Sequence, residues 1–177
     1  MIRIMQLPIS LLPGLLVLVI STSAAAENTI QKMRAARLPS TPAAQLQIYA
    51  SDPDWRVRRE VASNRRAPQP ILRALATDPR SEVKIAVATN LATDEATFLL
   101  LADDPDTTIR SVVARFEYVA PAALDKLARD SDPDIRLEVA RAFNTQPATL
   151  KILMDDEYES VQQAAAHSLA SREAGRR

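Results

Sequence analysis

The sequence lacks cysteine altogether and has only two glycines and one histidine among its 177 residues. Without cysteine the chain can form neither disulfide bonds nor a lipoprotein anchor, so its stability must come from packing. A metal site needs several nitrogen or sulfur donors, and the single histidine, His167, does not supply them. The scarcity of glycine, together with abundant Ala, Leu, Arg and Glu, favours helices. No segment alternates as a β-strand would.

Net charge is also missing, because 22 Lys and Arg are balanced by 22 Asp and Glu. A balanced chain is not expected to bind nucleic acid or an anionic membrane through bulk charge. No Ser–His–Asp set, Cys–His pair or glycine-rich phosphate loop is visible. Acidic clusters at 103–106, 130–134 and 155–157 lack the glycine turn and terminal glutamate of an EF-hand, and we interpret them as helix caps. The sequence therefore predicts no enzyme activity, no metal and no cofactor.

The N-terminus contains an apolar run over residues 7–20, followed by small residues up to Ala26. This order is typical of a secretory signal peptide, and it predicts cleavage between Ala26 and Glu27. The alternative is a retained membrane anchor. However, the run is shorter than the roughly 20 residues of a spanning helix, and it contains Pro8 and Pro13. We expect a periplasmic or secreted protein with 1–26 as its signal peptide.

The most informative feature that is present is a 26-residue period. A β-branched apolar residue followed by a basic one recurs in four copies, and a fifth copy has glutamine in the basic position. The pairs are Val57-Arg58, Val83-Lys84, Ile109-Arg110, Ile135-Arg136 and Val161-Gln162. Self-similarity at a fixed period of this length predicts an array of stacked structural repeats.

Each copy opens with an aspartate, which proline follows in the first three copies. These aspartates are Asp52, Asp78, Asp104, Asp130 and Asp156. Aspartate before proline predicts an N-cap followed by a first-turn proline. In the fourth copy the proline is displaced to Pro133, which predicts a helix that begins two residues late. Asn64 and Asn90 are expected to end their helices in the left-handed conformation.

The apolar positions of each copy fall into two helical patterns. In the first pattern, Val57 and Val61 lie four residues apart, and the later copies have apolar residues at the same two positions. A column of alanines that begins at Ala62 lies beside them. After a turn, a second column pairs Leu72 with Leu75. Each repeat is thus predicted to contain two antiparallel helices of roughly 11 and 9 residues. Helices this short are marginal alone, so stacking must stabilise them.

These patterns predict an all-α fold, a right-handed α-solenoid of about four to five two-helix repeats. We assign residues 27–40 to an N-terminal cap helix, 41–172 to the solenoid and 173–177 to a polar tail.

The run Leu75-Ala76-Thr77-Asp78-Pro79, continued by Val83-Lys84, Val87-Ala88 and Asn90, resembles the variant leucine-rich repeat, with the pattern L-A-x-D-P-x-x-x-V-R-x-x-V-A-x-N. It is also similar to the broader HEAT and armadillo-like helical repeats. The resemblance implies an α-solenoid without naming a function. The period is longer here than is usual in that family, which implies fuller second helices. The iron–sulfur cluster of the family's founding architecture is excluded, because its cysteines are absent.

The basic column has two possible roles. It could be an anion-binding ladder, or it could pair with the aspartate column in a structural ladder, as in the HEAT-type repeats that it resembles. We favour the structural ladder, because acidic and basic positions repeat together. Its members are Asp52, Arg58, Asp78, Lys84, Asp104, Arg110, Asp130 and Arg136.

The positions that differ between copies are candidates for contacts with another protein, because a binding surface mixes apolar and polar side chains. The candidates are Trp55, Arg59, Ile85, Arg115, Phe116, Tyr118, Leu137 and Arg141. Each has a structural alternative: Trp55 could cover a neighbouring turn, the aromatic residues could pack within their own loops, and Arg115 and Arg141 could interact with helix dipoles.

The sequence therefore predicts an exported, non-enzymatic scaffold that binds another protein, in the role of a toxin-immunity protein or an envelope assembly factor. The alternative is a ligand-binding or enzymatic protein that holds an anion on its basic columns.

Overall fold

The computed structural model describes residues 28–174. Within that range every regular element is a helix, and the first covers residues 28–37, inside the expected cap. The predicted signal peptide and residues 175–177 of the predicted tail lie outside the described residues. Over residues 28–174, no helix combines the length and apolar character needed to cross a membrane.

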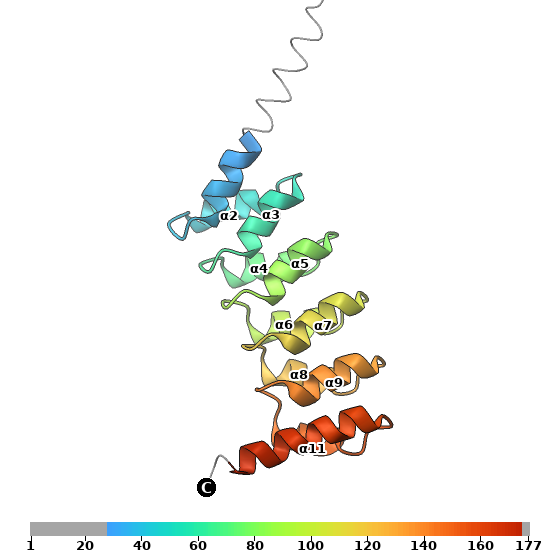
Figure 1. Ribbon diagram of the computed structural model, residues 1–177. Helices are drawn as coiled ribbons and strands as arrows, with labels where there is room; N and C mark the ends of the chain where they lie inside the picture. Colours follow the sequence, from blue (N-terminus) through green and yellow to red (C-terminus); the bar gives the residue numbers. More distant parts are fainter. Residues whose placement is uncertain (1–27, 175–177) are drawn as a thin grey trace, which may run out of the picture.

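Two kinds of helix alternate along the chain (Figure 1). We call the longer ones A helices and the shorter ones B helices. The A helices are α3 (Trp55–Ala62), α5 (Ser81–Ala88), α7 (Thr107–Arg115), α9 (Pro133–Arg141) and α11 (Glu159–Ala174). The B helices are α2 (Ala43–Tyr49), α4 (Gln69–Leu75), α6 (Glu95–Leu101), α8 (Pro121–Leu127) and α10 (Pro147–Leu153).

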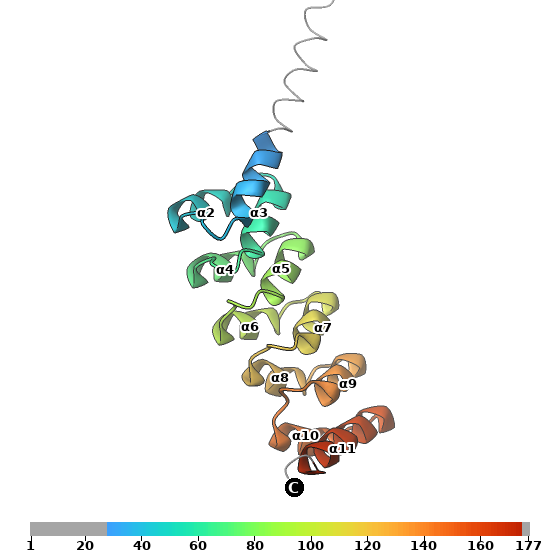
Figure 2. The same ribbon diagram turned by 60° about the vertical axis from the view of Figure 1, so that its left-hand side comes forward.

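The A helices stack on one another in sequence order, with α3 against α5, α5 against α7, α7 against α9 and α9 against α11. The B helices form a second column beside them, which Figure 2 shows from another side. Each pair therefore contacts mainly its neighbours, as expected for a quasi-one-dimensional array. The arrangement confirms an all-α repeat solenoid.

The core follows the predicted columns. Val57, Val61 and their equivalents through Val139 are at most 1% exposed, as are the leucines at Leu101 and Leu127. The alanine column is fully buried from Ala62 to Ala140. Its fifth member, Ala166, is exposed, because no further A helix covers α11 within residues 28–174. The 26-residue period thus places one slice of core in each repeat.

The predicted role of the opening aspartates as N-caps is wrong. The N-caps are Asp54, Arg80, Asp106 and Asp132, two residues later in each copy. Asp52 instead accepts the backbone N–H of Asp54 at 2.9 Å, closing a turn that contains the proline. The residue before a proline avoids helical geometry, so the helix begins only after this turn.

The predicted late start of the fourth A helix is also wrong. α9 begins at Pro133, in register with the starts at Trp55, Ser81 and Thr107. The displaced proline occupies the first helical position, where its missing N–H loses no bond. The helices are shorter than expected. The A helices α3, α5, α7 and α9 have 8 or 9 residues, and each B helix has 7. The reason is that a capping turn occupies the first residues of each copy.

Candidate functional site

The basic and acidic columns meet as a ladder of ion pairs between neighbouring repeats. Each basic side chain binds the aspartate 20 positions further along, at the turn that opens the next repeat. The shortest N–O distances are 2.7 Å for Lys32–Asp52, 2.6 Å for Arg58–Asp78, 2.7 Å for Lys84–Asp104, 2.7 Å for Arg110–Asp130 and 2.6 Å for Arg136–Asp156. The pairing joins every repeat to its successor.

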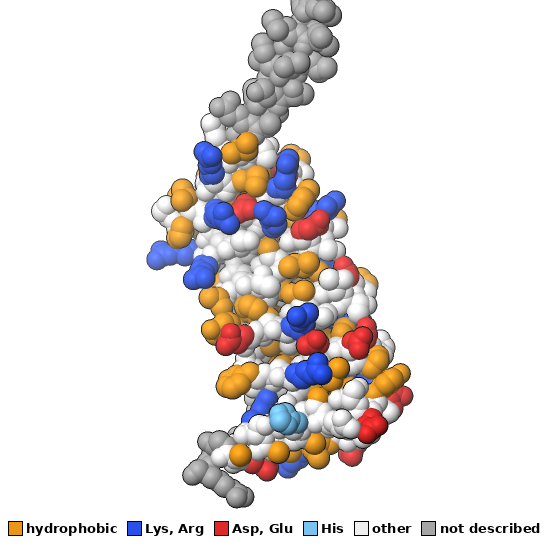
Figure 3. Space-filling view, viewed as in Figure 1, with side chains coloured by type: hydrophobic (Ala, Val, Ile, Leu, Met, Phe, Trp, Pro, Cys, Tyr) orange, Lys and Arg blue, Asp and Glu red, His pale blue; other side chains and the backbone are white. Residues whose placement is uncertain are grey.

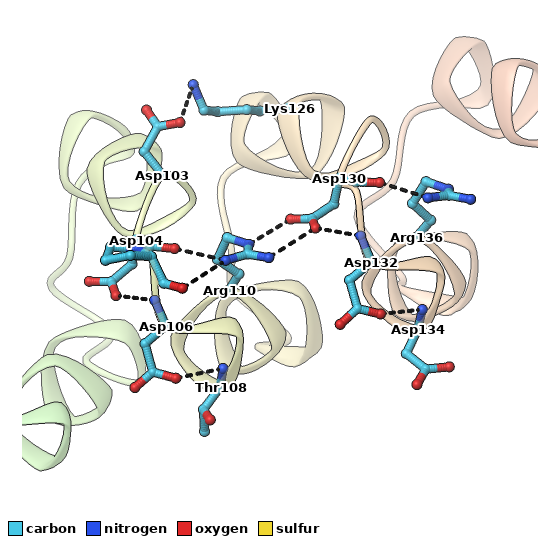
Figure 4. A network of polar contacts seen from close by, with 11 residues as sticks. Asp103, Asp104, Asp106, Thr108, Arg110, Lys126, Asp130, Asp132, Asp134 and Arg136 are labelled. Atoms are coloured by element: carbon cyan, nitrogen blue, oxygen red, sulfur yellow. Dashed lines mark hydrogen bonds and ion pairs between the residues drawn. The ribbon is translucent and has the colours of Figure 1, made fainter.

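Arg110 shows how one rung is built (Figure 4). Its Nε and Nη2 donate to the two carboxylate oxygens of Asp130 at 2.7 and 3.1 Å. Its Nη1 donates to the backbone carbonyl of Asp104, in its own repeat, at 2.9 Å. Asp130 also accepts the backbone N–H of Asp132 at 2.9 Å. One guanidinium therefore fixes two turns at once, which a planar fork of donors allows.

The ladder is electrostatically satisfied. Burial by itself would raise the pKa of Asp78, but the hydrogen bonds and charge of Arg58 outweigh it and hold the pKa below its usual range. The same balance lowers the pKa of Asp130 beside Arg110. At Asp156 the hydrogen bond from Arg136 is the main cause of the lowered pKa. All of these carboxylates are ionised at neutral pH, so the paired arginines are not free to bind an anion.

The ladder begins and ends outside the motif that predicts it. Lys32 supplies a first rung that the sequence analysis missed, although it lies one 26-residue period before Arg58. At the far end Gln162 donates to the backbone carbonyl of Asp156, as the arginines do in their own repeats, but makes no ion pair. Within the described residues, the last ion pair of the ladder is therefore that of Arg136 with Asp156.

A second ladder consists of buried asparagines, and the expected left-handed role of Asn64 and Asn90 is wrong. No non-glycine residue in 28–174 has a positive φ. Asn90, 4% exposed, donates to the backbone carbonyls of Ala62 and Asn64 at 2.6 and 3.0 Å. Its Oδ1 accepts the N–H of Ala92 at 2.8 Å. The asparagine therefore ties together consecutive turns between A and B helices.

The asparagine ladder changes register in the third and fourth copies. Phe116 stands where Asn64 and Asn90 stand, and α7 is one residue longer than α5. Asn144, two residues later than the repeat predicts, donates to the carbonyls of Glu117 and Val119 at 2.7 and 3.2 Å. The 26-residue period is thus kept, although the turn between the A and B helices has a different structure in these copies.

The aromatic residues fill the altered turn in part. The Phe116 ring is half-buried, with its centroid 6.0 Å from that of Phe98 and 5.9 Å from that of Tyr118. Tyr118 is 63% exposed and Phe143, in the next turn, is 83% exposed. Loop packing therefore accounts for Phe116, whereas most of Tyr118 and Phe143 faces solvent.

Trp55 lies half-buried at the start of α3, with two guanidinium groups close to its ring. The Cζ atoms of Arg59 and Arg80 are 5.7 and 5.0 Å from its ring centroid, within cation–π range. Arg80 belongs to the turn that opens the next repeat. Trp55 thus covers a neighbouring turn, the structural alternative considered for it.

The remaining candidates lie on the outer face of the A helices. Ile85 and Leu137 are partly exposed and pack against the core edge. Arg59 pairs with the buried Glu60 at 2.7 Å, while Arg115 lies 4.0 Å from Glu138. Arg141 is exposed. Arg59, Ile85 and Leu137 occupy one repeat position, and Arg115 and Arg141 lie four residues after that position. All five therefore share one face of the A helices, apart from the ladder position.

One hollow of about 390 Å³ lies beside the ladder, between the turns that follow α6 and α8. Asp103 and Lys126 belong to its lining, and Figure 4 shows the ion pair between them, whose N–O distance is 2.8 Å. Arg110 and Asp130 line its floor and are already paired. In the part of the chain that the structure describes, no three His, Cys, Asp or Glu side chains are grouped to hold a metal. The hollow is a polar crease between repeats.

Short helix pairs, stacked in one direction and joined by an ion-pair ladder, define a helical repeat protein. Residues 55–80, one full period, match the family described as leucine rich repeat variant, a HEAT-like helical repeat family. This match confirms the resemblance inferred from the motif. A search of curated proteins finds no match.

Proposed function

We propose that the chain is a non-enzymatic scaffold that binds another protein on the outer face of its A helices. The support is a contrast between columns. The core and ladder positions repeat from copy to copy, whereas the outer column reads Arg59, Ile85, Ser111 and Leu137. A surface whose framework is constant and whose exposed side chains vary is suited to one specific partner.

A ligand-binding or enzymatic function on the basic columns has weaker support. An anion would have to displace Asp130 from Arg110, whose guanidinium makes four hydrogen bonds and is only 15% exposed. The displaced carboxylate would remain partly buried without a partner, which is strongly unfavourable. The ladder therefore serves stability in this proposal.

The proposed location is outside the cytoplasm, in the periplasm or secreted, and it rests on the apolar run at 7–20 and the small residues up to Ala26. Within that location the scaffold would act as an immunity protein for a secreted toxin or as an envelope assembly factor. A toxin gene beside this gene would favour the first role.

The test is affinity capture from an envelope extract of the source organism, with the full chain as bait. Ile85→Glu and Leu137→Glu together place charge on the outer face and should abolish capture of any specific partner. Ile48→Glu, at a 64% exposed position on the B side, is the matched control and should leave capture intact. Thermal melts verify that all three proteins are folded. Loss of capture in the control as well, or no specific protein at all alongside a co-purifying small molecule, would refute the proposal.

A further inference from the structure

Charge is divided along the solenoid although the chain as a whole is neutral. Residues 28–80 contain ten Lys and Arg against four Asp and Glu, whereas residues 81–174 contain nine against seventeen. Figure 3 shows basic side chains gathered over the N-terminal helices and acidic ones over the later repeats. The N-terminal end is therefore a basic surface that whole-chain composition conceals.

Most basic residues of this end already have acidic partners. Lys32 and Arg58 belong to the ladder, and Arg56, Arg59, Arg73 and Arg80 each pair with a carboxylate within 3.0 Å. Arg37 is largely exposed and lies 3.5 Å from Glu60. Arg34, Arg65 and Arg66 are exposed and have no carboxylate partner among the residues that the structure describes. Three unpaired arginines at one end of a repeat array leave charge available to another molecule.

The asparagine ladder places two of these arginines, Arg65 and Arg66, on one edge. Asn64 donates to the carbonyls of Ala36 and Leu38 at 2.7 and 3.0 Å, which joins the turn after helix 28–37 to the turn after α3. Arg65 and Arg66 follow Asn64 directly. Asn90 then joins the next turn to the carbonyl of Asn64 at 3.0 Å. Three consecutive turns are thus held side by side.

Apolar side chains lie on the same edge. Leu38 is 54% exposed in the first turn and Leu91 is 50% exposed in the third. Between the second and third turns lies a hollow of about 210 Å³ whose lining includes Arg65, Thr89 and Leu91. We define the N-terminal turn edge as Arg37, Leu38, Arg65, Arg66 and Leu91. It offers guanidinium groups next to exposed leucines.

We propose that the N-terminal turn edge binds an acidic segment of another protein, with carboxylates on the arginines and apolar side chains against Leu38 and Leu91. This inference rests on the proposed protein-binding function and names the partner's chemistry. Guanidinium forks suit carboxylates, and exposed leucines gain from contact with apolar side chains. A long nucleic acid fits less well, because the acidic later repeats would repel its phosphates and the leucines would find no apolar partner.

The direct test uses a fluorescent synthetic peptide in which glutamate alternates with leucine, bound to the full chain at low ionic strength. Arg65→Gln with Arg66→Gln should weaken binding about tenfold, and salt should weaken it as well. Arg129→Gln with Lys151→Gln removes the same charge from exposed positions of the later repeats and should leave affinity unchanged. The peptide with glutamine in place of glutamate should bind at least tenfold more weakly.

Three results would overturn the inference. Equal weakening by both double variants would indicate diffuse charge attraction. Tighter binding to phosphatidylglycerol vesicles or to single-stranded DNA, with the same dependence on Arg65 and Arg66, would indicate a different class of partner. A salt-sensitive dimer that the Arg65/Arg66 variant abolishes would indicate that a second copy occupies the edge.

The two proposals can fail separately. Suppose that the Ile85/Leu137 variant loses the envelope partner but the Arg65/Arg66 variant keeps it. This result would refute binding at the N-terminal turn edge and would support the protein-binding scaffold. If only the Arg65/Arg66 variant loses the partner, the result would support binding at the N-terminal turn edge and would contradict binding on the outer face.

Discussion

Lys32 Nζ lies 2.7 Å from Asp52 Oδ2, so the ion-pair ladder begins one repeat before the first recognisable motif. From there each A helix is bound to the turn that opens the following repeat, down to Arg136 and Asp156. Helix 28–37 is therefore joined to the array by the same device as the internal repeats. A stack whose units contact only their neighbours depends on such links at every junction.

Arg110→Ala should lower the free energy of unfolding by about 2–4 kcal/mol. The substitution leaves Asp130, 6% exposed, without its ion pair and frees the carbonyl of Asp104. Urea denaturation monitored by circular dichroism measures the change.

The matched control is Arg56→Ala in an A helix of the same stack. Arg56 pairs with Asp54 at 2.7 Å but is 55% exposed, so solvent screens the pair and its loss should leave the unfolding free energy nearly unchanged. Equal destabilisation by the two substitutions would show that the ladder has no special structural role.

Asn90→Ala should lower the unfolding free energy by about 2–3 kcal/mol, because the carbonyls of Ala62 and Asn64 would lose their donor in a buried site. Asn144→Ala is the comparison, since Asn144 bonds to the exposed Glu117 carbonyl, where water can replace it. Thermal melts of both variants decide the point. If Asn144→Ala proves the more harmful, burial is not what makes the asparagine important.

The period alone was enough to predict the helices, the buried columns and the pairing of basic with acidic positions, because a repeat imposes one solution on every copy. The capping turn was predicted wrongly. An aspartate before a proline can cap the helix itself, or it can close a turn whose N-cap lies two residues later. Only the path of the backbone distinguishes the two. Asn64 and Asn90 were misjudged for a related reason, since their carbonyl partners lie 26 and 28 positions away.

Whole-chain composition also concealed the feature on which the further inference depends. A net charge of zero excludes attraction by bulk charge, yet an elongated array can separate its charges along its length. Arg65 and Arg66 follow Asn64 in the sequence and were not singled out, because no motif marks them. Their significance depends on the absence of nearby carboxylates, which is a property of the fold.

Acid should destabilise the array through the ladder aspartates. The pKa values of Asp78, Asp130 and Asp156 are lowered in the folded chain, so near pH 4 the unfolded chain binds more protons than the folded one. Their stabilising contribution is present above the unfolded value of about 3.9 and is lost as the pH falls through the lower folded values. Melting temperatures measured from neutral pH to about pH 3 should fall most steeply below about pH 4.

Asp78→Asn tests the origin of this pH dependence. The variant should be less stable than the native chain at neutral pH but lose less stability on acidification, because one linked group has been removed. Asp103→Asn, at a 63% exposed carboxylate paired only with Lys126, should keep the native pH dependence. An unchanged acid slope in the Asp78 variant would contradict the assignment.

Leu101→Ala should destabilise the protein by about 2–5 kcal/mol, because Leu101 is fully buried on the inner face of α6 and the remaining cavity cannot collapse freely. Leu100 is the adjacent residue of the same helix and is 39% exposed, so Leu100→Ala removes the same atoms from a position that already contacts water. Its effect should be less than half as large. Paired melts of the two variants separate burial from helix propensity, which is identical in both. A loss below about 1 kcal/mol at Leu101 would contradict its place in the core.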